Sequence, residues 1–147
     1  MKKLNSERGQ SLVELSISLL ILLYLLSGAV EFGIAFFQFV QLRDAAQEGA
    51  LYGSMQPTNT AGIAARVQGA SNSPIDLADT SLVLIDLQID GVPIDTAITA
   101  GNACEGHGLE VTVSFNHTVF MPFMSAIVGN TIPLNASVTD TILSPPC

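Results

Sequence analysis

The N-terminal third of the chain is dominated by one long apolar run. No charged residue occurs from 15 to 30, and after Glu31 none occurs from 32 to 42. A bilayer core requires roughly 20 mostly apolar residues at about 1.5 Å rise each, so this run is long enough to cross a membrane once. Since the first proline is Pro57, we expect one continuous helix over about residues 11–54.

Two features of this helix predict contacts along its sides. Small residues recur every four positions in its C-terminal part, and aromatic residues follow helical spacing nearer its middle: Ala45, Gly49 and Gly53; Ala46, Ala50 and Ser54; Phe32, Phe36 and Phe39. Small residues let another backbone approach closely. We expect them to pack on the chain's own sheet, the alternative being subunit contact in a filament. Lipid or a neighbouring helix would explain the aromatic stripe.

The rest of the chain alternates between apolar and polar residues in short stretches. Alternation over residues 83–89, 109–115 and 134–143 predicts three strands of an antiparallel sheet, each with one buried face. Asn59 or Thr60 caps a short connecting helix that ends near Gly69. The apolar stretch 121–129 is expected to cover the chain's own fold, the alternative being a contact surface. The predicted fold class is α+β, a long N-terminal transmembrane helix with a small antiparallel β-sheet head.

Charge is distributed unevenly along the chain. The net charge is −8, yet Lys2, Lys3 and Arg8 are three of only five basic residues and all precede the apolar run. By the positive-inside rule the N-terminus stays cytoplasmic and the head is extracytoplasmic. The acidic remainder excludes nucleic acid as a partner.

The two cysteines, Cys104 and Cys147, both lie in the predicted head. Outside the cytoplasm disulfides form and persist, so we expect a Cys104–Cys147 bridge. Two unpaired thiols are one alternative. A zinc site is the other, because His107 follows Cys104 by three residues, but it would need further ligands and the only other histidine is His117. We expect no metal and no cofactor.

The sequence carries no recognisable catalytic motif. A nucleophile elbow, a phosphate-binding loop, a dinucleotide fingerprint and a His-Glu-x-x-His zinc motif are all missing from it. The acids Asp86, Asp90 and Asp95 lack the alternating spacing of a calcium loop, and a solvated strand face explains them. We therefore expect a protein that is not an enzyme.

Glu14 stands at the mouth of the apolar run, where a carboxylate is costly. A short basic leader that ends in Gly9 and continues Gln10, Ser11, Leu12, Val13, Glu14 resembles the class III signal of type IV pilins. The resemblance implies that a prepilin peptidase cleaves after Gly9, so that Gln10 becomes the N-terminus. It also implies that Glu14 pairs with the N-terminal amine of a neighbouring subunit. A glutamate that merely snorkels to the interface is the alternative.

A longer resemblance covers residues 30–54. Glu31, Phe32 and Gly33 are similar to a mid-helix element of the TadE-like family, minor pilins or pseudopilins of the tight-adherence (Tad) secretion system. A second element is similar to the family's Ala-Ala-x-Glu-Gly-Ala-x-Tyr, with matching residues Ala45, Ala46, Glu48, Gly49, Ala50 and Tyr52. Glu31, in mid-run, either sits at the outer membrane interface or meets a partner chain during assembly.

The resemblance implies a structural subunit with a leader at 1–9, a helical pilin-like stalk at 10–54 and a head at 55–147. Its expected partners are the prepilin peptidase, membrane lipid and other pilin or pseudopilin subunits, in a homo- or hetero-oligomer. It would reside in the membrane as a single-pass protein, or in an extracellular pilus on the cell surface. The alternative function is an unprocessed bitopic protein whose head is a binding module.

Overall fold

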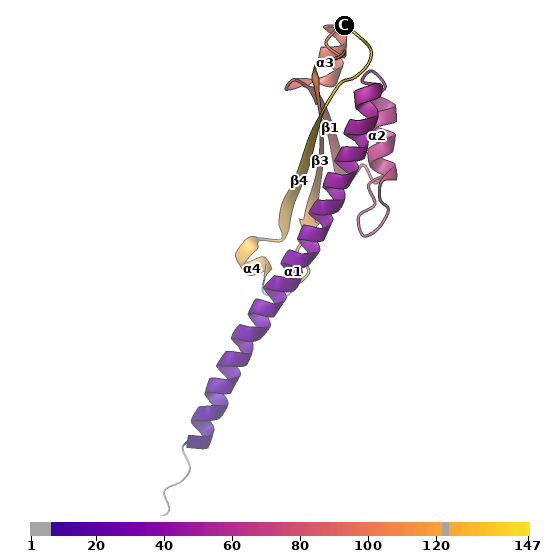
Figure 1. Ribbon diagram of the computed structural model, residues 1–147. Helices are drawn as coiled ribbons and strands as arrows, with labels where there is room; N and C mark the ends of the chain where they lie inside the picture. The colour runs from indigo at the N-terminus through magenta and orange to yellow at the C-terminus, as the bar shows by residue number, and fades with distance from the viewer. Residues whose placement is uncertain (1–6, 122–123) are drawn as a thin grey trace, which may run out of the picture.

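A computed structural model describes residues 7–121 and 124–147 of the chain. Lys2, Lys3 and most of the expected leader, together with Pro122 and Phe123 of the apolar stretch, lie outside the described residues. One long helix carries a small head at its C-terminal end (Figure 1). The predicted α+β class, with an N-terminal apolar helix and an antiparallel sheet, is confirmed.

Helix α1, Glu7–Met55, contains 49 residues without a break and is about 74 Å long at 1.5 Å per residue. It is long and apolar enough to cross a membrane. The head packs against its C-terminal half, while its N-terminal half extends away from the head (Figure 1). The continuous helix expected over 11–54 is therefore confirmed.

The sheet has four antiparallel strands in the order β2-β1-β3-β4. They are β1 (Val83–Ile89), β2 (Val92–Pro93), β3 (Gly108–Thr118) and β4 (Thr131–Thr141). The three predicted strands are confirmed as β1, β3 and β4, but β2 makes the predicted number wrong. Asp90 and Gly91 join β1 to β2 with φ of 50° and 78°, the left-handed values that a tight two-residue hairpin turn requires. Helix α3, Ile94–Thr99, follows β2 and was also not predicted.

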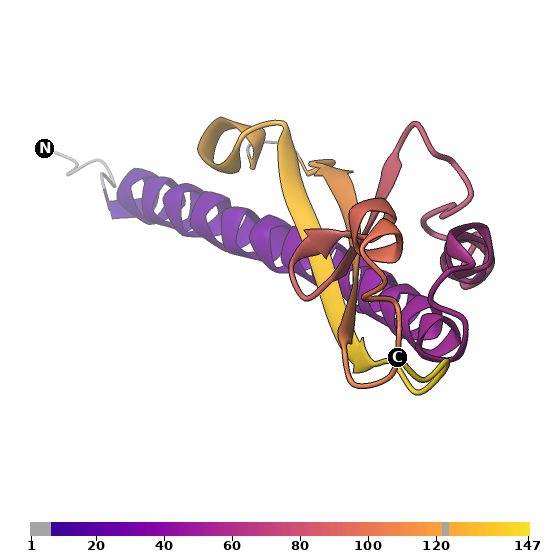
Figure 2. The same cartoon turned by 90° about the horizontal axis from the view of Figure 1, so that it is seen from above.

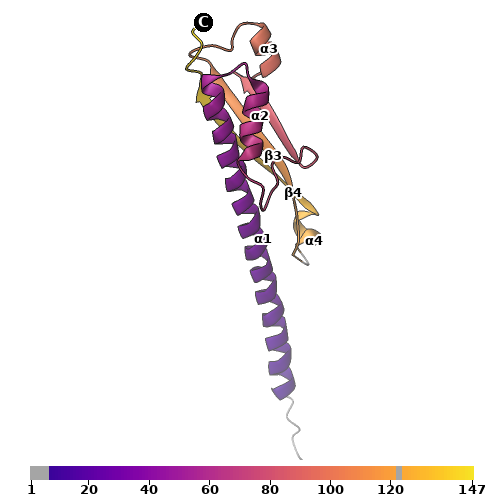
Figure 3. The same cartoon turned by 90° about the vertical axis from the view of Figure 1, so that its right-hand side faces the viewer.

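Helices α1 and α2 pack against the sheet. β3 and β4 contact α1 directly, and α2 (Thr60–Gly69) contacts both α1 and β1. Figures 2 and 3 show the sheet on one side of α1, with α2 beside the C-terminal part of that helix. The start of α2 is fixed by Asn59, whose Oδ1 accepts a hydrogen bond from the Gly62 N–H at 3.0 Å. The core between these layers includes Leu42, Ile63, Leu109, Val111 and Val113, each at 0% exposure.

The stripe of small residues on α1 is the surface that admits the head. A Cβ placed on Gly53 would lie 2.1 Å from Leu109 Cδ2, and one on Gly49 would lie 2.5 Å from Val67 Cγ2. Ala45, Ala46, Ala50 and Ser54 are also buried. The prediction that this stripe packs on the chain's own fold is confirmed.

The apolar stretch between β3 and β4 lies at the end of the head nearest the uncovered half of α1 (Figure 1). It contains α4, Ser125–Val128, none of whose residues is buried. Phe120, Ile127 and Val128 are exposed. The expectation that this stretch covers the chain's own fold is therefore wrong for α4, because none of its residues is buried.

Candidate assembly surface

The N-terminal half of α1 presents an uncovered apolar surface. Eleven large apolar side chains between Leu12 and Leu26 are 53–67% exposed. Burial of apolar surface is worth about 25 cal/mol per Å², so a surface of this size is stable only when lipid or other helices cover it. Residues 12–26 thus form a surface suited to contact with lipid or with helices of other chains.

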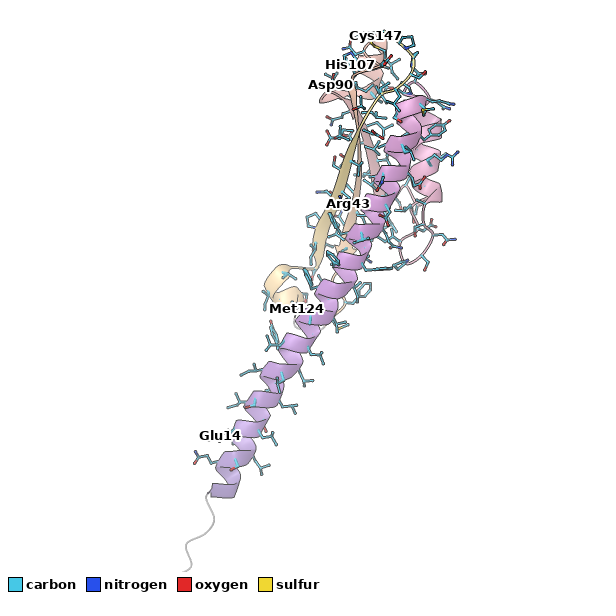
Figure 4. The ribbon with its side chains drawn as sticks, viewed as in Figure 1. Glu14, Arg43, Asp90, His107, Met124 and Cys147 are labelled. Carbon is cyan, nitrogen blue, oxygen red and sulfur yellow. A yellow bond between two sulfur atoms is a disulfide. The ribbon has the colours of Figure 1, made fainter. Side chains whose placement is uncertain are left out.

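The expected processing and assembly residues lie at the start of this surface. Gln10 Nε2 donates a hydrogen bond to Glu14 Oε1 at 3.1 Å, one helical turn away, and both side chains are exposed. Glu14 projects from the helix far from the head (Figure 4). A Cβ placed on Gly9 would meet nothing within 4 Å. The structure therefore brings Gln10 and Glu14 together and leaves Gly9 open.

Glu31 lies in a different environment, about 26 Å further along the helix. Its side chain is buried, and its carboxylate faces the end of β3. Glu31 Oε1 lies 2.6 Å from His117 Nε2, and the backbone N–H groups of Phe120 and Met121 donate to the carboxylate at 3.2 and 2.8 Å. The carboxylate thus finds its partners in the chain's own head, an arrangement that neither expectation for Glu31 included.

The tautomer of His117 follows from what surrounds its ring. His117 is completely buried, and its Nδ1 has no hydrogen-bond partner among the described residues. A carboxylate only accepts hydrogen bonds, so the ring nitrogen that faces Glu31 must be the donor. We therefore assign the proton to Nε2, which donates to Glu31. The ring is also edge-on to Phe120, with centroids 6.0 Å apart.

The pairing of His117 with Glu31 was not predicted, although the strand pattern contains a signal for a buried polar residue there. Leu109, Val111 and Val113 point into the core, and the same alternation places Phe115 and then His117 on the inner face of β3. A polar residue at an inward position of a strand requires a buried partner. The predicted strand ended at Phe115, one alternation too early.

A second polar cluster lies at the end of the head that is farthest from Glu14, where Asp90, His107 and Cys147 are labelled (Figure 4). The sulfurs of Cys104 and Cys147 are joined in a disulfide with their Cα atoms 5.0 Å apart. This bridge connects the loop before β3 to the segment after β4, and those strands are hydrogen-bonded neighbours, as the expected bridge requires.

Beside the bridge, His107 Nδ1 lies 2.6 Å from Asp90 Oδ2, and Asp90 Oδ1 accepts from the Gly108 N–H at 2.9 Å. The hydrogen bond with the His107 imidazole, and to a smaller extent the bond from the Gly108 N–H, hold the pKa of Asp90 below its usual range. Asp90 is thus a structured turn residue, and the interpretation of it as part of a solvated strand face is wrong.

The geometry also bears on the zinc alternative. Ligand atoms of Cys104, His107 and Cys147 lie within 4.8 Å of one another. Thiolates, the form of cysteine that binds zinc, are absent while the two sulfurs share a bond, so the bridge and a metal at this place exclude each other. His117, the other histidine considered as a ligand, belongs to the Glu31 site instead.

The fold and the uncovered helix define a class, an α+β protein whose single long apolar helix fits a single-pass membrane protein. Within that class, a family model described as TadE-like protein matches residues 9–51. The resemblance to the TadE-like family is confirmed over this part of the chain, which lies entirely in α1. Proteins of this family are associated with the Tad pilus. No curated protein and no solved structure matches the chain.

Proposed function

We propose that this chain is a prepilin-type structural subunit that is cleaved after Gly9. Its N-terminal helix then assembles into a Tad or type IV-like pilus, or into the membrane complex that initiates one. The observation that carries this proposal is the division of α1: its C-terminal half is buried by the head, while eleven large apolar side chains of its N-terminal half stay exposed. Lipid covers that half before assembly, and other subunits cover it afterwards.

The leader residues 1–9 and the prepilin peptidase belong to the first step. The N-terminus faces the cytoplasm and the head, from about residue 55, is extracytoplasmic, so cleavage releases a helix that begins at Gln10. Glu14, four residues later, remains exposed and within one turn of the new amine. In an apolar helix array a lone carboxylate costs up to about 2.5–3.5 kcal/mol, and the cationic amine of a neighbouring subunit offsets that cost.

Intact mass of the chain purified from its native membrane tests the processing step. The expected mature chain starts at Gln10, and Gly9→Arg should retain the full leader, because a bulky cation does not fit where the peptidase requires a small residue. A wild-type chain that keeps Met1 to Gly9 would favour the alternative, an unprocessed bitopic protein with a binding head.

Incorporation into sheared surface filaments tests the assembly step. Glu14→Gln keeps the size of the side chain and removes its charge, so the variant should be processed normally and be depleted from filaments. Asp44→Asn, at an exposed acid on the head-bound half of α1, is the matched control and should assemble like wild type. Equal incorporation of processed Glu14→Gln would show that Glu14 only snorkels to the interface.

A further inference from the structure

The connection from β3 to β4, at the end of the head nearest the uncovered half of α1, contains no charged residue. We define the base loop as residues 119–121 and 124–129, the described part of the connection from β3 to β4. Phe120 is 67% exposed, Ile127 64% and Val128 43%. Ser125 is the only polar side chain among these residues. An apolar surface at one end of a small head marks a contact with another phase or another protein.

The base loop lies beside the membrane-length part of α1. Met121 lines an apolar groove together with Leu20, Tyr24 and Val30, and Met124 Sδ lies 3.6 Å from the position that a Cβ on Gly28 would occupy. A span that starts near Ser11 and takes roughly 20 residues ends near Val30. The loop is therefore level with the last two turns of the span, roughly 3–9 Å inside its outer boundary.

The backbone of the base loop is suited to a place with little water. In the outer part of a bilayer an unpaired N–H costs several kcal/mol, so any chain there must satisfy its donors internally. The N–H groups of Phe120 and Met121 donate to the Glu31 carboxylate. Further N–H groups of the loop donate to backbone carbonyls of the same connection: Val119, Ile127, Val128 and Gly129.

We propose that the base loop is a second membrane contact, which inserts Phe120, Ile127 and Val128 into the outer leaflet while Glu31 holds the loop against α1. Lipid is the occupant because the exposed side chains of the loop continue the lipid-facing surface of the helix. On the other side of the loop, a groove of about 390 Å³ is lined by Glu31 and by apolar residues that include Phe32, Phe36 and Val128. Its apolar lining matches the chemistry of an acyl chain at the outer edge of the span.

This contact gives the membrane-held subunit two points of attachment, the helix and the base of the head. A single helix can tilt and rotate in a bilayer, whereas a second apolar contact beside it at the interface restricts both motions. The inference rests on the proposed membrane-embedded state that precedes assembly.

Tryptophan quenching in lipid vesicles tests the inference with the full chain, because the sequence contains no tryptophan. We would introduce Ile127→Trp as the reporter and Leu143→Trp as the control, since Leu143 is 61% exposed and lies at the far end of the head, where its N–H donates to the Ser54 carbonyl. Leu20→Trp reports on the span itself. The vesicles would contain phospholipids brominated on the acyl chains, near the headgroup to report on Ile127→Trp and near the chain ends to report on Leu20→Trp, at a low ratio of protein to lipid.

We expect Ile127→Trp and Leu20→Trp to show blue-shifted emission that brominated lipid quenches, and Leu143→Trp to remain unquenched. If Leu20→Trp is quenched while Ile127→Trp behaves like Leu143→Trp, the inference is overturned and the membrane span stands. Emission from Ile127→Trp that is blue-shifted but unquenched would assign the loop to a second copy instead, which also overturns it. An unquenched Leu20→Trp would contradict the membrane-held state and, with it, the proposed function. Phe120→Trp repeats the test at an independent position.

Discussion

The Nε2 atom of His117 lies 2.6 Å from Oε1 of Glu31, although 86 residues separate the two in the chain. This contact fixes the end of β3 to α1 at the level where the helix leaves the head. It also explains how a glutamate can stand within a run of apolar residues, because the carboxylate accepts hydrogen bonds from the imidazole and from two backbone N–H groups.

Glu31→Ala should destabilise the head strongly. The substitution leaves His117 Nε2 and the N–H groups of Phe120 and Met121 without their acceptor, and a buried donor left without an acceptor costs about 1–3 kcal/mol. Thermal unfolding of the head in detergent micelles measures this. Glu48→Ala, at an exposed position of the same helix, is the control and should change stability by less than about 0.5 kcal/mol. Equal unfolding temperatures for the two variants would refute the structural role of Glu31.

Gly53→Ala should lower the stability of the head, whereas Gly33→Ala should leave it unchanged or raise it slightly. At Gly53 a new Cβ would lie 2.1 Å from Leu109 Cδ2 in the packed core, and overpacking costs about 1–3 kcal/mol. At Gly33 a Cβ meets nothing within 4 Å, so only the helix propensity of alanine, a gain of up to about 1 kcal/mol, remains. Side-by-side thermal unfolding of the two variants distinguishes these cases.

Asp90 should make the stability of the head depend on pH. Its pKa in the folded chain lies below the ordinary value of 3.8, because His107 and the Gly108 N–H stabilise the carboxylate. This contribution is therefore present above pH 3.8 and is lost as the pH falls through the folded pKa. Asp90→Asn keeps a residue that tolerates the positive φ but removes the titrating group. The stability difference between wild type and Asp90→Asn should shrink on acidification; a difference independent of pH would exclude this mechanism.

The Cys104–Cys147 bridge should resist thiol reagents and should stabilise the head. In the loop-closure treatment, a bridge between residues 43 positions apart contributes about 4 kcal/mol. Alkylation of native, unreduced protein should therefore add no mass at either cysteine. The double variant Cys104→Ser/Cys147→Ser should unfold at the same lower temperature as reduced wild type. Labelling of both thiols in native protein would instead support the reduced alternatives.

The long helix and the main strands were predictable because their signals are local. An uninterrupted apolar run sets α1, and the strict alternation of Val83, Ile85, Leu87 and Ile89 sets β1. The hairpin that creates β2 also had a local signal, since Asp90-Gly91 between apolar residues favours a tight two-residue turn. The prediction instead placed Asp90 on the polar face of the strand.

The Glu31 site was not predictable in the same way. Its partners are His117 and two backbone N–H groups, whose proximity depends on how β3 is placed against α1, and no spacing along the sequence encodes that placement. The orientation of the base loop is likewise tertiary. The run from Val119 to Gly129 is apolar whether it covers the fold or faces outward, so the pattern alone could not decide between them.

The division of α1 between head and surroundings also determines where compensating mutations can arise. Leu42 is 0% exposed and packs within its own head, so a change of its volume can be corrected only by residues such as Val113 or Ala136 in the same polypeptide. Leu20 touches no core residue and is 67% exposed. In the proposed assembly, a change there can be compensated only by a residue of another subunit. Coevolution along this one helix should therefore be intramolecular in its C-terminal half and intermolecular in its N-terminal half.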